Sequence, residues 1–214
     1  MNKLCAGVTA VLVAAAGAGL SGCAQPQAVA SSPGMMMAKM QELGTPGSQH
    51  ELLRKFTGTW AAEAKFWMEA SQQEPDVSKG VMTVHEMLGG RYIHGDYKGS
   101  FSIPGPDGKM QEMQFNGHML RGYSNADKRF ESVWIDSEST SILWSTGQAG
   151  GDGRSIQSTG RANGADMAGN VVDQRMWETF TMVSGDKWVQ EMWGQCGNGP
   201  KFKNMEITYT RTGR

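Results

Sequence analysis

Short, evenly spaced segments with strand composition constrain the fold of this chain more than any other feature. From Trp60 onward, segments of about eight to twelve residues rich in Thr, Val, Ile, Trp, Phe and Tyr alternate with turn clusters such as 104–108 and 150–153. No helix-length periodic stretch separates them, and this arrangement is typical of an antiparallel meander. The expected strands lie near 60–69, 80–88, 91–101, 110–123, 128–137, 140–148, 154–162, 170–183, 186–195 and 202–211.

A meander of about ten strands has two exposed edges unless the sheet closes on itself. The sequence therefore predicts an all-β fold, an antiparallel up-and-down β-barrel, and its 29 glycines suit the tight turns and bends that closure requires. Ahead of the first strand, Ser48 and Glu51 form an S-x-x-E pattern, which predicts a capping box and a short helix through Phe56.

Polar and apolar residues share both faces of the expected strands. Phe130, Ser132, Trp134 and Asp136, for example, lie on one face of the segment 128–137. A packed sandwich would separate the two kinds of residue more cleanly, so the mixture favours a barrel with a small core at one end and a lumen that tolerates polar groups. A barrel of eight or more strands can hold one small ligand.

The first residues of the chain have the composition of an export signal. Lys3 precedes an apolar run of mainly Ala, Val, Gly and Leu, and this run ends in Leu20-Ser21-Gly22-Cys23. These four residues resemble a bacterial lipobox, in which the cysteine thiol receives a diacylglycerol and the chain is cut before it. The alternative is an ordinary secretory signal cut near Ala24. We expect a signal peptide at 1–22, a lipid-modified Cys23 at the start of a flexible tether at 23–47, and a single barrel domain at 48–214.

Charge and cysteine content limit the expected partners. The formal net charge of −1 favours neither nucleic acid nor an anionic membrane surface, so the expected membrane contact is the lipid on Cys23. Because Ala24 rather than Asp follows Cys23, the resemblance to other lipoproteins implies the outer membrane, with the domain facing the periplasm. Cys196 is the single thiol of the expected domain, so no intramolecular disulfide can form there.

Two groups of motifs carry a family resemblance. Gly58-Thr59-Trp60 and Arg211 resemble the G-x-W motif and the terminal arginine of lipocalin-like (calycin) barrels, where the indole closes the barrel base and the guanidinium stacks on it. A wider resemblance is to the bacterial family catalogued as domain of unknown function 1579 (DUF1579). It rests on His50-Glu51-Leu52-Leu53, Leu88-Gly89-Gly90-Arg91-Tyr92, Gly122-Tyr123, Trp134-Ile135-Asp136 and Glu206-Ile207-Thr208-Tyr209-Thr210-Arg211. This resemblance implies a calycin-type barrel and no catalytic residue, and Ser124 departs from the acidic residue expected after Gly-Tyr.

Polar and aromatic residues of the strands and turns are the candidate ligand contacts of the expected lumen. They are Arg91, His94, Trp134, Asp136 and Trp177. If Trp134 faces the lumen, Asp136 does too, because it lies one pleat further along the strand. A carboxylate in an apolar, water-poor cavity can serve as an acid or as a ligand anchor. The alternative is that Asp136 caps the turn at 137–140 and that Arg91 pairs with Glu86.

The motifs of common enzyme classes are absent from the sequence. It contains no G-x-S-x-G, H-E-x-x-H or C-x-x-C pattern and no phosphate-binding glycine loop that leads into a helix. Of the four histidines, His94 and His118 lie in expected strands. One of them would ligate haem, as in the haem-binding barrel nitrobindin, or act as a base; the alternative is a hydrogen-bonded or solvent-facing side chain. Apart from this haem alternative, the sequence indicates no cofactor.

The thioethers of Met35-Met36-Met37 and Met40 in the tether are soft ligands of the kind that select Cu(I); the alternative is that Met36, Met40 and Leu43, at helical spacing, pack on the domain. The sequence indicates no other metal site.

The sequence thus favours a lipid-anchored barrel of the cell envelope that binds a small, largely apolar molecule in its lumen without covalent chemistry. One alternative is a hydrolase or isomerase that uses Asp136 with His94 or His118. Another is a structural or partner-binding envelope module, which would carry an apolar patch on the outer wall. The sequence indicates neither the identity of the ligand nor the oligomeric state.

Overall fold

The computed structural model describes residues 33–104, 109–166 and 168–213. Within these residues the chain forms two helices followed by ten strands. The helices are α1 (Pro33–Gly44) and α2 (Ser48–Arg54). The strands are β1 (Gly58–Phe66), β2 (Asp76–Met87), β3 (Tyr92–Pro104), β4 (Met110–Ser124), β5 (Arg129–Asp136), β6 (Leu143–Ala149), β7 (Ser155–Ala165), β8 (Val171–Ser184), β9 (Lys187–Cys196) and β10 (Phe202–Gly213). The ten expected strands are confirmed, with bounds that differ by a few residues.

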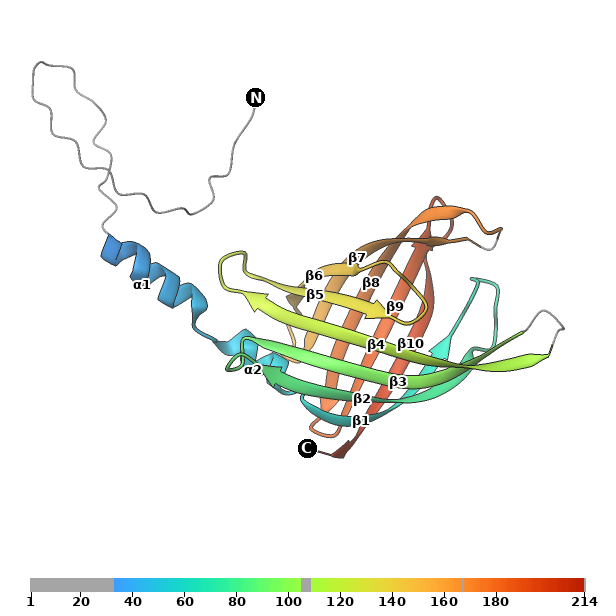
Figure 1. Ribbon diagram of the computed structural model, residues 1–214, viewed down its shortest axis with the longest axis horizontal. Coiled ribbons are helices and arrows are strands. Elements are labelled where there is room, and N and C mark those ends of the chain that lie inside the picture. Colours follow the sequence, from blue (N-terminus) through green and yellow to red (C-terminus); the bar gives the residue numbers. More distant parts are fainter. Residues whose placement is uncertain (1–32, 105–108, 167, 214) are drawn as a thin grey trace, which may run out of the picture.

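The strands pair in chain order, and the sheet closes because β1 pairs with β10 as well as with β2. Every pair is antiparallel. At the closing seam, Ala64 on β1 lies between Ile207 on β10 and Ser78 on β2. Closure satisfies the backbone groups of both terminal strands, so the predicted up-and-down barrel is confirmed. Figure 1 shows this barrel, with α2 at one of its ends.

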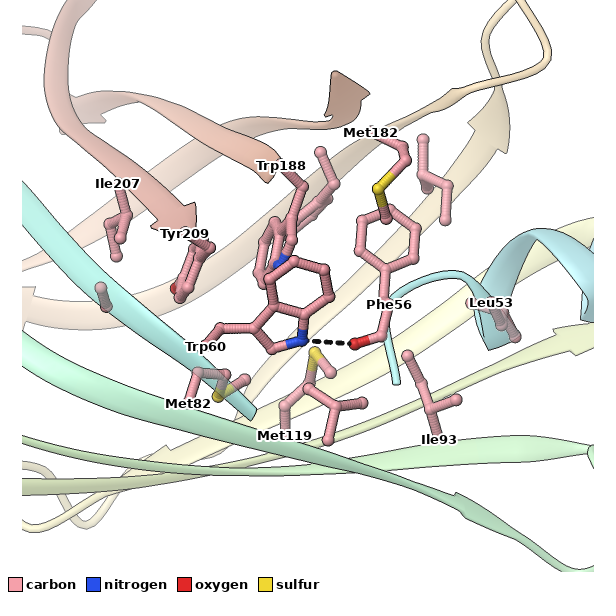
Figure 2. Packing of buried hydrophobic residues seen from close by; sticks show 14 of the residues in the cluster. Leu53, Phe56, Trp60, Met82, Ile93, Met119, Met182, Trp188, Ile207 and Tyr209 are labelled. Carbon is pink, nitrogen blue, oxygen red and sulfur yellow. Dashed lines mark hydrogen bonds between the residues drawn. The ribbon is translucent and has the colours of Figure 1, made fainter. Parts of the chain in front are cut away.

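The hydrophobic core fills the end of the barrel at which α2 lies (Figure 2). Trp60 has no exposed surface, and its indole Nε1 donates a hydrogen bond to the carbonyl of Phe56 at 2.9 Å. Trp188 packs edge-on against Trp60, with ring centres 6.1 Å apart, and stacks on Tyr209 at 3.6 Å. Burial of each large side chain of this kind contributes about 1.5–3 kcal/mol. These side chains give the barrel a solid base.

Arg211 closes the base from outside the core. Its Cζ lies 3.9 Å from the ring centre of Trp60, and its Nη1 donates to the carbonyl of Thr57 at 2.8 Å. Gly58 leaves room for this guanidinium, since a Cβ at that position would lie 2.3 Å from Nη1. Gly58 also has a φ of +121°, which side chains other than glycine's rarely allow. The stacking predicted from the G-x-W motif and the terminal arginine is confirmed.

The start of α2 differs from the expected capping box. The helix begins at Ser48 as predicted, but Gly47 is the residue that precedes it, and Nδ1 of His50 accepts the Gly47 amide at 3.0 Å. Glu51 instead contacts Arg54 one turn later. His50 therefore takes the role expected of Glu51 in the capping box, because its Nδ1 accepts the backbone amide three residues earlier.

The segment ahead of the barrel is partly helical. The expected tether at 23–47 contains α1, which projects from the barrel (Figure 1) and has no buried residue. The side-chain amide of Asn125 holds the end of this segment by donating to the carbonyls of Leu43 at 2.9 Å and Thr45 at 2.8 Å. The expected signal peptide and Cys23 lie outside the described residues. Within the described ranges, no helix has the length and apolar character needed to cross a membrane.

Candidate functional site

The inner face of the barrel changes character from one end to the other. Near α2, the inward side chains are buried in the core cluster. Toward the opposite end, inward side chains pack against that core but remain only partly buried; they include Phe66, Phe115, Trp134 and Met205. Since these side chains point inward and still contact solvent, the barrel interior is open to solvent at this end. We call it the open end.

An aromatic row lines the open end across β3, β4 and β5. Phe115 lies edge-on to Tyr97 and Phe101, with ring centres 5.8 Å and 5.9 Å away, and stacks on Trp134 at 6.4 Å. Gly117 makes this arrangement possible, since a Cβ there would lie 2.2 Å from the Trp134 ring. The row offers flat apolar surface of the kind that binds small molecules.

Asp136 orients the indole at the edge of this row. One of its carboxylate oxygens accepts a hydrogen bond from Trp134 Nε1 at 2.8 Å, and the other accepts the backbone amide of Glu138 at 3.0 Å. The two expectations for Asp136 are therefore compatible: the carboxylate lies beside the lumen and also holds the turn after β5. Its position fixes the rotamer of Trp134.

A polar layer lies below the aromatic row, inside the barrel. Its two charged members, Arg121 on β4 and Glu178 on β8, are only 4% and 7% exposed. The Arg121 guanidinium lies 3.7 Å above the ring of Phe180. Gln190 donates to Glu178 at 3.4 Å and accepts from the Tyr209 hydroxyl at 3.3 Å. A buried polar layer of this kind is costly unless its groups pair well.

Burial shifts the ionisation of both charged members of this layer. It lowers the pKa of Arg121 to about 10, although the negative charge of Glu178 acts in the opposite direction. It raises the pKa of Glu178, against the positive charge of Arg121 and hydrogen bonds from Gln190 and Ser145. Buried titratable groups with shifted pKa values are enriched at functional sites.

Two buried donors of the interior have no hydrogen-bond partner within the described part of the chain. They are Nε of Arg121 and the indole Nε1 of Trp188. Unpaired buried donors are uncommon in folded proteins because each one loses its hydrogen bond to water without replacement. Trp188 is packed in the solid base, whereas Arg121 belongs to the polar layer above it, so Arg121 Nε is the donor available to an acceptor group that enters from the open end.

Only two of the residues expected to contact a ligand come together. Trp134 and Asp136 lie on the inner face of β5, beside one another. Trp177 lies on the outer face of β8, because the neighbouring Glu178 points inward and is buried. The Lys201 ammonium lies 3.9 Å from the ring centre of Trp177. Arg91 lies in the turn before β3 and donates to the carbonyl of Leu88 at 2.9 Å. The expected partner of Arg91, Glu86, pairs instead with Arg54, at 2.7 Å.

The strand histidines lie on the outer wall. On β3, Ile93 and Tyr97 point inward and are buried. Since side chains alternate along a strand, His94 faces outward. On β4, the inward Met119 puts His118 outward in the same way. Neither imidazole points into the lumen, so the haem alternative has no histidine ligand there, and both side chains are solvent-facing, as in the other interpretation of these histidines. An acid–base pair of Asp136 with either histidine does not form either, because the sheet separates them.

Arg121 and Glu178 were not among the residues expected to line the lumen. The signal was present: Glu178 lies between Met176 and Phe180 on one face of its strand, and Arg121 lies between Met119 and Tyr123. A charged side chain that shares a strand face with apolar residues is a candidate for a buried, functional group, whereas one on a mixed face is not distinguished in this way.

Two pockets lie apart from the aromatic row. One of about 750 Å³ lies at the α2 end, where its lining includes Arg54, Lys55, Arg154 and Arg211. The other, of about 470 Å³, lies at β6, β7 and β8, and its lining includes both the outward Trp177 and the inward Glu178. Neither pocket includes the aromatic row.

An apolar row on the outer wall matches the feature expected of a partner-binding module. Leu120, Val133 and Trp144 are direct cross-strand neighbours on β4, β5 and β6, and Trp144 is 66% exposed. Leu120 is 39% exposed. The three side chains lie on the outer surface of the sheet, so they are separated by the sheet from the core and from the polar layer inside the barrel.

These features define the class of protein: a closed ten-stranded antiparallel barrel with a solid base, a buried polar layer and an aromatic open end. Residues 45–211 match the family described as "Protein of unknown function (DUF1579)". The chain belongs to this family. A comparison with curated proteins gives no match.

Two solved structures resemble this chain at low sequence identity. The crystal structure of Rv2717c from M. tuberculosis is 13% identical, with a TM-score of 0.50, and the match covers 78% of this chain and 99% of that chain. A redesigned β-barrel, b11L5F_LGL, is 12% identical over 76% of this chain and 94% of its own, with a TM-score of 0.33. The first of these likenesses supports the barrel fold and nothing further.

Proposed function

We propose that this protein binds a small, largely apolar molecule at the open end of its barrel, without covalent chemistry. The observation that carries the proposal is the contrast along the inner face. The base is packed solid, whereas inward aromatic side chains at the other end keep solvent contact. These aromatic rings are rigid and partly solvent-exposed in the free protein. When an apolar ligand covers them, the removal of apolar surface from water favours binding.

The polar layer supports a ligand that also carries one hydrogen-bond acceptor. Ligand sites in proteins combine apolar walls with a few polar groups that fix orientation. Here Trp134 and Phe115 supply the wall, and the unpaired Nε of Arg121 supplies a deeper donor. The apolar part of the ligand lies against the aromatic row, and its acceptor group points down the barrel.

Binding of an amphipathic aromatic probe tests this proposal. The probe 8-anilinonaphthalene-1-sulfonate carries a flat apolar body and an anionic acceptor, and its fluorescence rises on transfer from water. We expect Trp134→Ala to weaken its affinity about tenfold, which corresponds to about 1.4 kcal/mol. Trp177→Ala is the matched control, because this indole lies on the outer wall. Equal affinities of the two variants, or no binding by the wild type, would contradict the proposal. Thermal unfolding of both variants shows that the fold is retained.

We further propose that the protein is lipid-anchored at Cys23 in the bacterial envelope, facing the periplasm from the outer membrane. The support is the sequence pattern that ends in Cys23, and the exposed α1 suits a spacer between membrane and barrel. Metabolic labelling with palmitate in a bacterial host tests the anchor. We expect Cys23→Ser to abolish labelling and Cys196→Ser to retain it, since Cys196 is an exposed free thiol of the barrel. Labelling that survives Cys23→Ser would refute the anchor.

A further inference from the structure

Three side chains with metal-ligating atoms converge on the outer wall, away from the lumen. They are His94 and Asp96 on β3 and His118 on β4. Their ligating atoms all lie within 4.8 Å of one another. We propose that His94, Asp96 and His118 bind a divalent transition-metal ion, with Zn²⁺ as the first choice.

The register of the sheet brings these residues together. His94 and Asp96 are two residues apart on β3, so both face outward, and Asp96 lies directly opposite His118 on β4. The two imidazole rings lie 5.7 Å apart and nearly parallel, at 13°. Asp96 lies between them, with one carboxylate oxygen 2.7 Å from His118 Nδ1 and the other 3.4 Å from His94 Nδ1. Backbone pairing thus holds the three ligands without any help from loops.

These distances suit a tetrahedral ion. Zinc bonds of about 2.0–2.2 Å to nitrogen and oxygen require ligand atoms about 3.3 Å apart. The separation of 3.4 Å between His94 and Asp96 already meets this value, and that of 2.7 Å between His118 and Asp96 is a hydrogen bond that opens by about 0.6 Å when an ion enters. Small rotations of exposed side chains provide this change, because Asp96 and His118 are 33% and 53% exposed.

The ligand set favours a borderline ion with a free coordination position. Two imidazoles and one carboxylate select transition metals over Mg²⁺ or Ca²⁺, which prefer oxygen ligands. Three protein ligands leave a fourth position that faces solvent, as in zinc sites that hold a water molecule. His85 on β2 is the direct cross-strand neighbour of His94 and shares its outward face, so a third imidazole lies beside the group.

Zinc titration by calorimetry tests the site on protein that carries no polyhistidine tag and has been dialysed against a chelator. We expect one Zn²⁺ per wild-type chain, and an affinity at least about tenfold weaker for His118→Gln and for Asp96→Asn. Glu131→Gln is the matched control, since Glu131 is another outward carboxylate of the wall, paired with Arg129. Its zinc affinity should equal that of the wild type.

Cobalt substitution gives a second readout that is independent of affinity. Co²⁺ in a site with two histidines and one carboxylate produces visible absorption that free Co²⁺ lacks, and this absorption should vanish in His118→Gln. No zinc binding by the wild type, or unchanged binding by His118→Gln and Asp96→Asn, would overturn the proposal. All of these positions are on the outer wall, so circular dichroism should show the same fold in each variant.

Discussion

Arg121 and Glu178 carry opposite charges into the interior of the barrel, from strands that are not neighbours in the sheet. Each residue is more than nine-tenths buried. Removal of two charges from water costs several kcal/mol per ion, and their attraction recovers this cost only when the geometry is favourable. The pair therefore shapes the interior at the expense of stability, which is expected of a site and not of a core.

This relationship predicts that the two charges depend on one another. Glu178→Gln removes the negative charge that acts on the buried Arg121, so the free energy of unfolding should fall by about 1–3 kcal/mol. The double variant Arg121→Met with Glu178→Leu removes both charges and should be as stable as the wild type or more stable. Urea unfolding of the wild type, Arg121→Met, Glu178→Leu and the double variant measures the coupling. A double variant less stable than either single variant would show that the pair stabilises the fold.

His50 should make stability depend on pH below neutrality. Its imidazole is 3% exposed, accepts the Gly47 amide and packs edge-on against Tyr123. Burial lowers its pKa from 6.5, so the unfolded chain binds the proton more readily than the folded chain. Stability is therefore complete above the unfolded pKa and falls as the pH drops through 6.5 toward the folded pKa.

The variant His50→Gln checks this dependence, because glutamine can accept a hydrogen bond but does not titrate. We expect the difference in midpoint temperature between the wild type and His50→Gln to shrink between pH 7.5 and pH 5 (about one pH unit on either side of an ordinary histidine pKa). Parallel curves over this range would mean that another group causes any acid sensitivity.

Gly58 should be intolerant of any side chain. Its φ of +121° disfavours other residues, and a Cβ would displace the Arg211 guanidinium from Trp60. Gly58→Ala should lower the free energy of unfolding by about 1–3 kcal/mol. Gly185→Ala is the control, since a Cβ there has no neighbouring atom within 4 Å. If both variants unfold alike, the base of the barrel is not held by this contact.

The barrel could be predicted from the sequence because its signals are local. Turn clusters mark the ends of strands, and the number of strands makes closure the economical solution. The stacking of Arg211 on Trp60 also followed, since the motif at the start of β1 and the arginine near the end of β10 meet wherever the first and last strands pair. Strand bounds depend on patterns within single segments of the sequence. Closure and the contact of Arg211 with Trp60 then follow from the number of strands and from the pairing of the first strand with the last.

The site was less predictable because it depends on the phase of each strand. Trp177 and His94 were expected near the lumen from residue type alone, yet Glu178 and Ile93 take the inward positions beside them. A Trp remains stable on the outer wall when a lysine covers its face, as Lys201 does. The polar layer was missed for a related reason: only the closed sheet shows that β4 and β8 both point their charged residues into one interior.

Gly117 determines where the Trp134 ring lies. A Cβ at this position would be 2.2 Å from that ring, so Gly117→Ala must move the indole and break its 2.8 Å hydrogen bond to Asp136. Overpacking of this kind costs about 1–3 kcal/mol of stability. It should also weaken binding of 8-anilinonaphthalene-1-sulfonate about as much as Trp134→Ala does, roughly tenfold.

The control for Gly117→Ala is Gly151→Ala, because a Cβ at Gly151 has no neighbour within 4 Å. Probe affinity measured by fluorescence titration and stability measured by urea unfolding separate two cases. If Gly117→Ala loses stability but binds the probe as the wild type does, the aromatic row is a structural part of the core and the ligand lies elsewhere. If it loses both, the flat face of Trp134 is part of the binding surface, since the three atoms nearest to the added methyl group all belong to that ring.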